Sequence, residues 1–158
     1  LMRTDPTSAD TRLADYLLGV VPPATNALVN LTLGGYFAGG RIWQLHSRFR
    51  YFDPAGRRAG LPEDIGALVE KLGADSATLT LVNVSPVTPR TLVVQAGGFG
   101  EHHFDSVTVD GKTTPVDSPI LTVRLEPGCG SRLNFRMTRY KNLPTLAHPW
   151  DRGWYGKN

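Results

Sequence analysis

The sequence predicts a mainly β protein, an antiparallel β-sandwich of about six to eight strands with an N-terminal helix and one short helix at about 62–73. From residue 77 to residue 138, short segments alternate apolar and polar side chains, as strands with one buried face do. Turn-forming Pro, Gly and Asp residues separate these segments. Helical spacing of apolar residues occurs at the N-terminus and at 62–73.

The N-terminal helix is predicted over residues 8–21. Leu13, Leu17 and Val20 recur at helical spacing, and Ser8 is a suitable N-cap. Because Pro22 and Pro23 follow directly, the helix is expected to end before them.

The next segment mixes several signals. "NALVNLTL" at 26–33 is short and apolar, so it fits either a strand or a turn of helix. Glycines at 34–40 indicate a loop, and the alternation at 47–51 predicts a strand. The Asp-Pro and Gly residues at 53–56 predict a turn.

The second helix is predicted from "LPEDIGALVEKLG". Pro62 suits a first helical turn, and Glu63 and Asp64 suit the positive end of the helix dipole. Gly73 suits the position after the last turn. The apolar positions that would form one helix face are Ile65, Leu68, Val69 and Leu72.

The rest of the chain is predicted to be strand. Strands are expected at 77–85 and 90–98, followed by a hairpin that turns at Asp110-Gly111. Two more strands are expected at 121–125 and 132–138, joined as a tight hairpin by "EPGCG". The side chains expected on the buried faces of that last hairpin are Leu121, Val123, Leu125, Leu133, Phe135 and Met137.

The C-terminal tail from residue 141 is not periodic. It contains Trp150, Trp154 and Tyr155, which are unusual in a solvated terminus. We therefore expect the tail to pack over a surface of this domain or of a partner. The domain division that we expect is a leading part at 1–60 (helix, glycine-rich loop and strand, the end of a preceding domain being one interpretation) and a sandwich with its aromatic tail at 61–158.

Composition and charge narrow the class of function. The chain has 158 residues, 41% of them hydrophobic and 20% charged, which is typical of one globular domain. Its formal charge of +3 is not gathered into a basic stripe, so we expect no nucleic-acid partner. No run reaches the roughly 18 apolar residues of a membrane span, so we expect no membrane partner. Cys129 is the single cysteine, which excludes an internal disulfide.

Three motifs within residues 76–140 resemble those of a known class of domain. "NVSP" ends one strand, "VTVDG" forms the predicted hairpin, and "LEPGCG" precedes the last strand. In residues 76–140 the chain thereby resembles the C-terminal β-sandwich accessory domains of bacterial multidomain carbohydrate-active enzymes. The resemblance implies an architecture and a multidomain parent; it names no substrate and assigns no catalytic residue. Since Leu1 precedes Met2, we also expect the chain to be a C-terminal piece of a longer protein.

The stretch "GGFGEHHFDS" at 97–106 raises the question of a site. His102 and His103 are adjacent, so on a strand they point to opposite faces and suit one metal ion poorly. We therefore expect no metal, no cofactor and no catalytic residue, and we interpret the loop as a place of contact at one end of the sandwich. Cys129 has no histidine near it in sequence, which argues against a nucleophile. The candidate binding residues are Trp43, Glu101, His102, His103, Trp150, Asp151 and Trp154.

Two interpretations of the tryptophans remain open, sugar stacking and apolar packing, and packing is favoured because a tryptophan buries a large area. The leading hypothesis is a non-catalytic accessory domain or subunit of a larger, carbohydrate-active bacterial enzyme. Its partners would be a neighbouring domain or subunit and a polysaccharide. One alternative is a fragment of a glycoside hydrolase or lyase that contributes part of an active site, and another is a structural subunit of an oligomer. The compartment stays open, with a secreted or periplasmic location slightly favoured over a cytoplasmic one.

Overall fold

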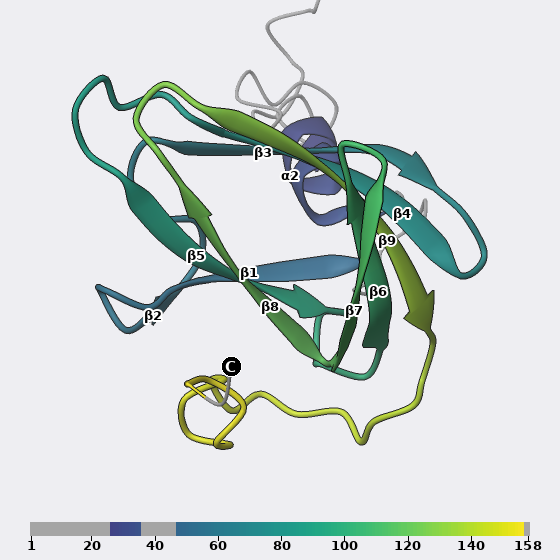
Figure 1. Cartoon of the computed structure of the whole chain (residues 1–158). Coiled ribbons are helices and arrows are strands. Elements are labelled where there is room, and N and C mark those ends of the chain that lie inside the picture. The colour runs from purple at the N-terminus through teal and green to yellow at the C-terminus, as the bar shows by residue number, and fades with distance from the viewer. Residues whose placement is uncertain (1–25, 36–46, 157–158) are drawn as a thin grey trace, which may run out of the picture.

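The computed structural model describes residues 26–35 and 47–156, which form two antiparallel β-sheets packed face to face (Figure 1). The four-stranded sheet has the order β2-β1-β5-β8, and the five-stranded sheet has the order β3-β4-β9-β6-β7. The predicted β-sandwich is confirmed, whereas the helix predicted at 8–21 lies outside the described residues. The elements are α2 (Asn26–Leu33), β1 (Phe49–Asp53), β2 (Arg58–Ala59), β3 (Ile65–Leu72), β4 (Ser76–Asn83), β5 (Arg90–Ala96), β6 (His103–Val109), β7 (Lys112–Ser118), β8 (Ile120–Leu125) and β9 (Gly130–Thr138).

The chain changes sheet after β2, β4, β5, β7 and β8. The remaining connections are hairpins. The sharpest of these hairpins joins β6 to β7 through a turn at Asp110-Gly111. Both residues have positive φ, at 50° and 78°, which is the geometry of the two-residue turn that Asp-Gly predicts. The strands predicted at 47–51, 77–85 and 90–98 are likewise confirmed as β1, β4 and β5.

The prediction of a helix at 62–73 is wrong, because this segment is strand β3. Its backbone pairs with β4 from Ile65↔Asn83 to Leu72↔Ala77, with a bulge between Val69 and Lys71. Ile65 and Val69 face the core, and the intervening Leu68 is exposed. A spacing of four residues is shared by a helix face and by alternate inward positions of a strand, so the tertiary pairing with β4 decided between them.

The ambiguous segment at 26–33 is a helix, α2, which lies beside the edge strand β3 (Figure 1). Its C-terminal end is fixed to the sandwich by Tyr51, whose hydroxyl donates a hydrogen bond of 2.6 Å to the carbonyl of Thr32. The backbone N–H of Arg48 donates to the carbonyl of Leu33 at 2.9 Å, so the end of α2 also sets the position of the residues that lead into β1.

Aromatic side chains from both sheets meet in the core between them. Phe104 of β6 stacks on Phe135 of β9 with ring centroids 4.4 Å apart, and Phe49 of β1 lies 5.3 Å from Phe135. Leu125, Leu133, Phe135 and Met137 are buried as expected from the sequence, and Leu121 and Val123 are partly buried against the same core.

The tight hairpin predicted at 126–130 is wrong. β8 pairs with β5 in one sheet, whereas β9 pairs with β4 and β6 in the other. The connection "EPGCG" is therefore a crossover between sheets. Turn residues indicate a change of direction, but they carry no information about which strand lies alongside.

A buried asparagine, Asn83 at the end of β4, holds this crossover in place. Its side-chain nitrogen lies within hydrogen-bonding distance of three carbonyl oxygens, at 2.9 Å from Thr88, 3.2 Å from Leu125 and 3.2 Å from Glu126. Its side-chain oxygen accepts the N–H of Ser85 at 3.0 Å. The side chain is 2% exposed, so these groups have no water to replace a lost partner.

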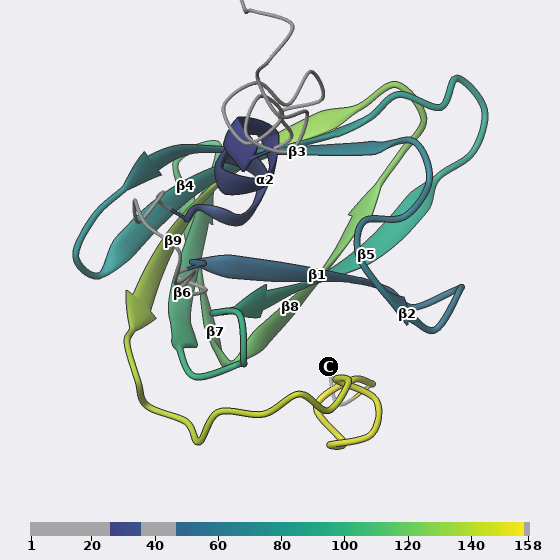
Figure 2. The same cartoon turned by 180° about the vertical axis from the view of Figure 1, so that it is seen from behind.

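The chain ends in a tail that coils beneath the four-stranded sheet, as the view from behind also shows (Figure 2). Within the described part of the chain, no helix has the length and apolar character needed to span a bilayer.

The contacts of Asn83 lead to the first prediction. Asn83→Ala should lower the free energy of unfolding by about 2–4 kcal/mol, because it leaves buried carbonyls without donors. Asn83→Asp should cost more, since it places a carboxylate oxygen against the same carbonyls. Urea denaturation measures both. The matched control is Asn134→Ala, an exposed asparagine of β9 that accepts one hydrogen bond, from Thr78. A loss for Asn83→Ala no larger than that of the control would contradict the role of Asn83.

Candidate functional site

The loop at 97–102 connects β5 to β6 and turns on two glycines with positive φ, Gly97 at 87° and Gly100 at 68°. Glu101 stabilises the turn from within, because its carboxylate accepts the N–H of Phe99 at 2.8 Å. A Cβ atom at Gly97 would collide with that carboxylate. The backbone conformation favours glycine at both positions, and the close approach of Glu101 adds a second reason at Gly97.

The two histidines that follow are buried and diverge. The ring of His102 accepts the backbone N–H of Tyr140 at its Nδ1 (3.1 Å), and its Nε2 lies 3.7 Å from the carboxylate of Glu101. His103 instead contacts Asp117, with 2.8 Å between Nε2 and Oδ1. No group of three or more His, Cys, Asp or Glu residues within the described ranges is placed to hold a metal ion.

His102 is held in its neutral form. Burial lowers its pKa, the nearby carboxylate of Glu101 opposes this shift, and the charges of Arg48 and Arg139 add to it. The hydrogen bond that Nδ1 accepts from Tyr140 also requires an unprotonated Nδ1, so the single proton of the ring resides on Nε2. For Asp117, the hydrogen bond from His103 and then the charge of Lys141 lower the pKa.

Glu101 and His102 border a cavity of about 490 Å³ at this end of the sandwich. The cavity lies where the end of α2, the start of β1, the 97–102 loop and the end of β9 come together. Sequence analysis identified Glu101 and His102 as candidates and did not identify Arg48 or Arg139. The available signal was that both arginines lie at the ends of predicted strands. The other lining residues are Gly34, Ser47, Arg48, Leu72, Phe99, Arg139, Tyr140 and Pro144.

The same loop anchors the C-terminal tail. The side-chain nitrogen of Asn142 donates to the carbonyls of His102 (2.6 Å) and Gly100 (3.2 Å). Farther along, the N–H of Thr145 donates to the carbonyl of Phe99 at 2.8 Å. The loop therefore contacts the protein's own tail; its contact with a neighbouring domain, which the sequence analysis considered, stays a prediction.

The tail tryptophans pack on the outer face of the four-stranded sheet. Trp150 and Trp154 are partly buried against a small apolar cluster of Phe52, Val93 and Ile120. The expectation that the tail packs over a surface is therefore confirmed.

Both tryptophan rings also carry cationic partners. Arg57 lies over Trp150 at 5.4 Å from the ring centroid, and Arg152 lies over Trp154 at 4.9 Å. Asp151 between them is exposed and lies 3.6 Å from His148. Trp43, the remaining candidate from the sequence, lies outside the described residues.

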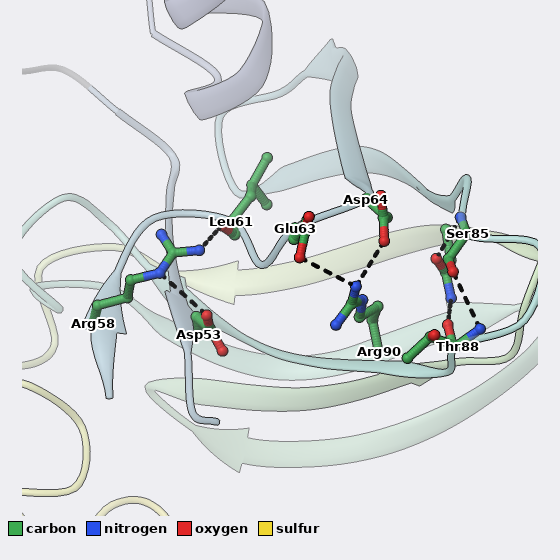
Figure 3. Close-up of polar contacts among 9 residues, drawn as sticks. Asp53, Arg58, Leu61, Glu63, Asp64, Ser85, Thr88 and Arg90 are labelled. Carbon is green, nitrogen blue, oxygen red and sulfur yellow. Dashed lines mark hydrogen bonds and ion pairs between the residues drawn. The ribbon is translucent and has the colours of Figure 1, made fainter. Parts of the chain in front are cut away.

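A second cavity, of about 440 Å³, lies at the opposite ends of the strands and has a different character. Its charged side chains pair with one another (Figure 3). Arg90 of β5 reaches Asp64 at 2.7 Å and Glu63 at 3.5 Å, and Arg58 reaches Asp53 at 3.2 Å. The ion pairs of Arg90 connect β5 to the segment before β3 and so join the two sheets, whereas Arg58–Asp53 joins β2 to β1 within one sheet. We interpret this cluster as structural.

No protein-family model, no curated protein and no solved structure matches this chain.

The packing of the tail generates the second prediction. Deletion of residues 146–158 removes Trp150 and Trp154 and exposes their apolar cluster, which should lower the free energy of unfolding by about 2 kcal/mol and the melting temperature by roughly 4–8 °C. Calorimetry of the truncated chain measures this. The control Leu143→Ala/Leu146→Ala changes two exposed tail residues and should melt like the wild type. A truncated chain that melts unchanged and stays monodisperse would contradict the packing role.

The environment of His102 generates the third prediction. Its pKa is lowered from 6.5 in the folded protein, so below that value the unfolded chain binds the proton more readily than the folded one. The associated stability is present above the unfolded-state pKa of 6.5 and is lost as the pH falls through the lower pKa of the folded protein. In His102→Asn, the slope of unfolding free energy between about pH 7 and about pH 5 should be shallower than in the wild type. Equal slopes from urea denaturation of the two proteins would disprove this assignment.

Proposed function

We propose that this chain is a non-catalytic accessory domain or subunit of a larger, carbohydrate-active bacterial enzyme, and that it packs against a neighbouring domain of that enzyme. The observation that carries the packing part is a set of exposed apolar side chains on α2 and β3. We call this set the α2–β3 face; it consists of Leu28, Val29, Leu31 and Leu72.

The exposure of this face is considerable. Leu28 is 66% exposed and Leu72 is 43% exposed. Leu31 and Leu72 line the same shallow groove of about 230 Å³, where α2 lies along β3. Large apolar side chains gathered in this way are typical of surfaces that another protein covers.

The position of the face supports a neighbouring domain as its occupant. β3 is an edge strand of the five-stranded sheet, and α2 is the first described element of the chain. Any polypeptide that precedes residue 26 joins the molecule beside this face. A domain tethered there meets the face without having to diffuse to it, which raises its effective concentration.

The carbohydrate-active parent enzyme rests on the resemblance of residues 76–140 alone. The motifs behind that resemblance have structural roles here: Asn83 and Ser85 fasten the crossover, and Asp110-Gly111 forms a tight turn. They support the architecture of an accessory domain and leave its ligand open.

The fourth prediction tests the α2–β3 face. If the remainder of the full reading frame is expressed separately, it should bind the 158-residue chain, and Leu28→Asp/Leu31→Asp should weaken that binding at least about tenfold. Calorimetric titration measures the affinity. Val87→Asp is the matched control, because Val87 is a highly exposed apolar residue far from the face in sequence, and its binding should equal that of the wild type.

Three outcomes would overturn the proposal. One is wild-type binding by the Leu28→Asp/Leu31→Asp variant. Another is a light-scattering mass of a dimer or larger assembly that this variant converts to a monomer, which would establish the alternative of an oligomeric structural subunit. Hydrolysis or lyase activity that requires Glu101 would establish the alternative of an active-site fragment.

A further inference from the structure

The cavity beside the 97–102 loop brings two guanidinium groups together. Arg48 enters it from the start of β1 and Arg139 from the end of β9. Each lowers the pKa of His102, and the charge of Arg139, after burial, contributes to the lowered pKa of Arg48. Two like charges in one cavity repel each other, which is unfavourable unless a counter-charge joins them.

Neither arginine forms a direct ion pair with a carboxylate among the described residues. The guanidinium of Arg48 donates to the carbonyl of Gly73 at 3.0 Å, and that of Arg139 donates to the hydroxyl of Tyr140 at 2.9 Å. These bonds orient the two groups and use only part of their donors, since each guanidinium has five N–H groups. This distinguishes the cavity from the one at Arg90, whose charges are paired within the protein.

The charges of the described side chains that line the cavity sum to one positive charge. Arg48 and Arg139 contribute two, the carboxylate of Glu101 subtracts one, and His102 is neutral. One monoanion would balance the site. A carboxylate matches the planar fork of an arginine better than a spherical ion does.

The other walls indicate what accompanies the carboxylate. Glu101 in an anion site is unfavourable for a bare anion, but its carboxylate can accept hydrogen bonds from hydroxyl groups of a ligand. Phe99 and Tyr140 add aromatic surface on which an apolar face of the ligand can lie. These groups together fit a carboxylic acid that also carries several hydroxyls.

Arg48, directly before β1, is preorganised for this role. The backbone N–H of Arg48 donates to the carbonyl of Leu33, and its carbonyl accepts the N–H of Gly97 at 2.8 Å. The end of α2 and the glycine loop thus hold its backbone from two sides. A donor fixed before binding loses little entropy on binding.

We infer that this cavity binds a small hydroxylated carboxylate, with Arg48 and Arg139 holding the carboxylate and Glu101 accepting hydroxyl groups. A sugar acid belongs to this class. The site does not depend on the accessory-domain proposal, because it is argued from Arg48, Arg139 and Glu101, although Leu72 borders both the cavity and the α2–β3 groove.

The fifth prediction uses galacturonate as the probe and galactose as its neutral counterpart. Titration of the 158-residue chain at low ionic strength should show saturable binding of galacturonate and none of galactose. Arg139→Gln should weaken the binding of galacturonate at least about tenfold, the usual effect of losing a charged hydrogen-bond donor. The affinity of Arg139→Lys for galacturonate should lie between those of the wild type and Arg139→Gln, because lysine keeps the charge and lacks the planar guanidinium fork.

The matched control is Arg136→Gln on β9, shortly before Arg139, where Arg136 is exposed and pairs with Asp75 at 2.8 Å. It should bind galacturonate as the wild type does. Arg139 is exposed, so its variants should fold, and a melting curve for each verifies this. Absence of galacturonate binding by the wild type, equal binding by Arg139→Gln, or equal binding of galactose would each overturn the inference.

Discussion

The chain crosses between the two sheets five times, and the fold depends on fixing these crossings at one end of the sandwich. The buried side chain of Asn83 provides the central contact there. One amide group reaches carbonyls of the loop that leads to β5 and of the link that leaves β8. The backbone N–H of Asn83 donates to the carbonyl of Cys129 at 2.8 Å, so β4 is bound to the same link. Only a side chain with both a donor and an acceptor on a short stem can satisfy these groups together.

The two ends of the sandwich have different chemistry. At the end with Asn83, the charged residues pair with each other across the sheets, as Arg90 does with Asp64. At the other end, the strands stop around a cavity whose arginines have no carboxylate partner among the described residues. A scaffold whose described charges pair at one end and leave one positive charge in excess at the other is suited to present a ligand site on loops supported by rigid strands.

The glycine loop at 97–102 serves the tail and the cavity at once. Its carbonyls bind the tail, while Glu101 and His102 face the cavity. Trp154 lies so close to Gly100 that a Cβ there would stand 3.1 Å from the ring. The loop therefore contacts both the tail and the cavity. Any partner that displaces the tail would also disturb the side chains of the cavity.

The sequence by itself determined those features that depend only on residues close together in the chain. The Asp110-Gly111 turn, the burial phase of Phe135 on β9 and the packing of an aromatic tail all follow from backbone preference and hydrophobicity of neighbouring residues. Only the tertiary structure decided that "IGALVEKL" is a strand, because its spacing satisfies both periods and pairing with β4 settles the choice. It also decided that β8 and β9 lie in different sheets, and that Arg48 and Arg139, 91 positions apart in the printed sequence, share a cavity with Glu101. Such contacts join residues whose separation along the chain is far longer than the reach of any turn or periodicity signal, so no local pattern could have specified them.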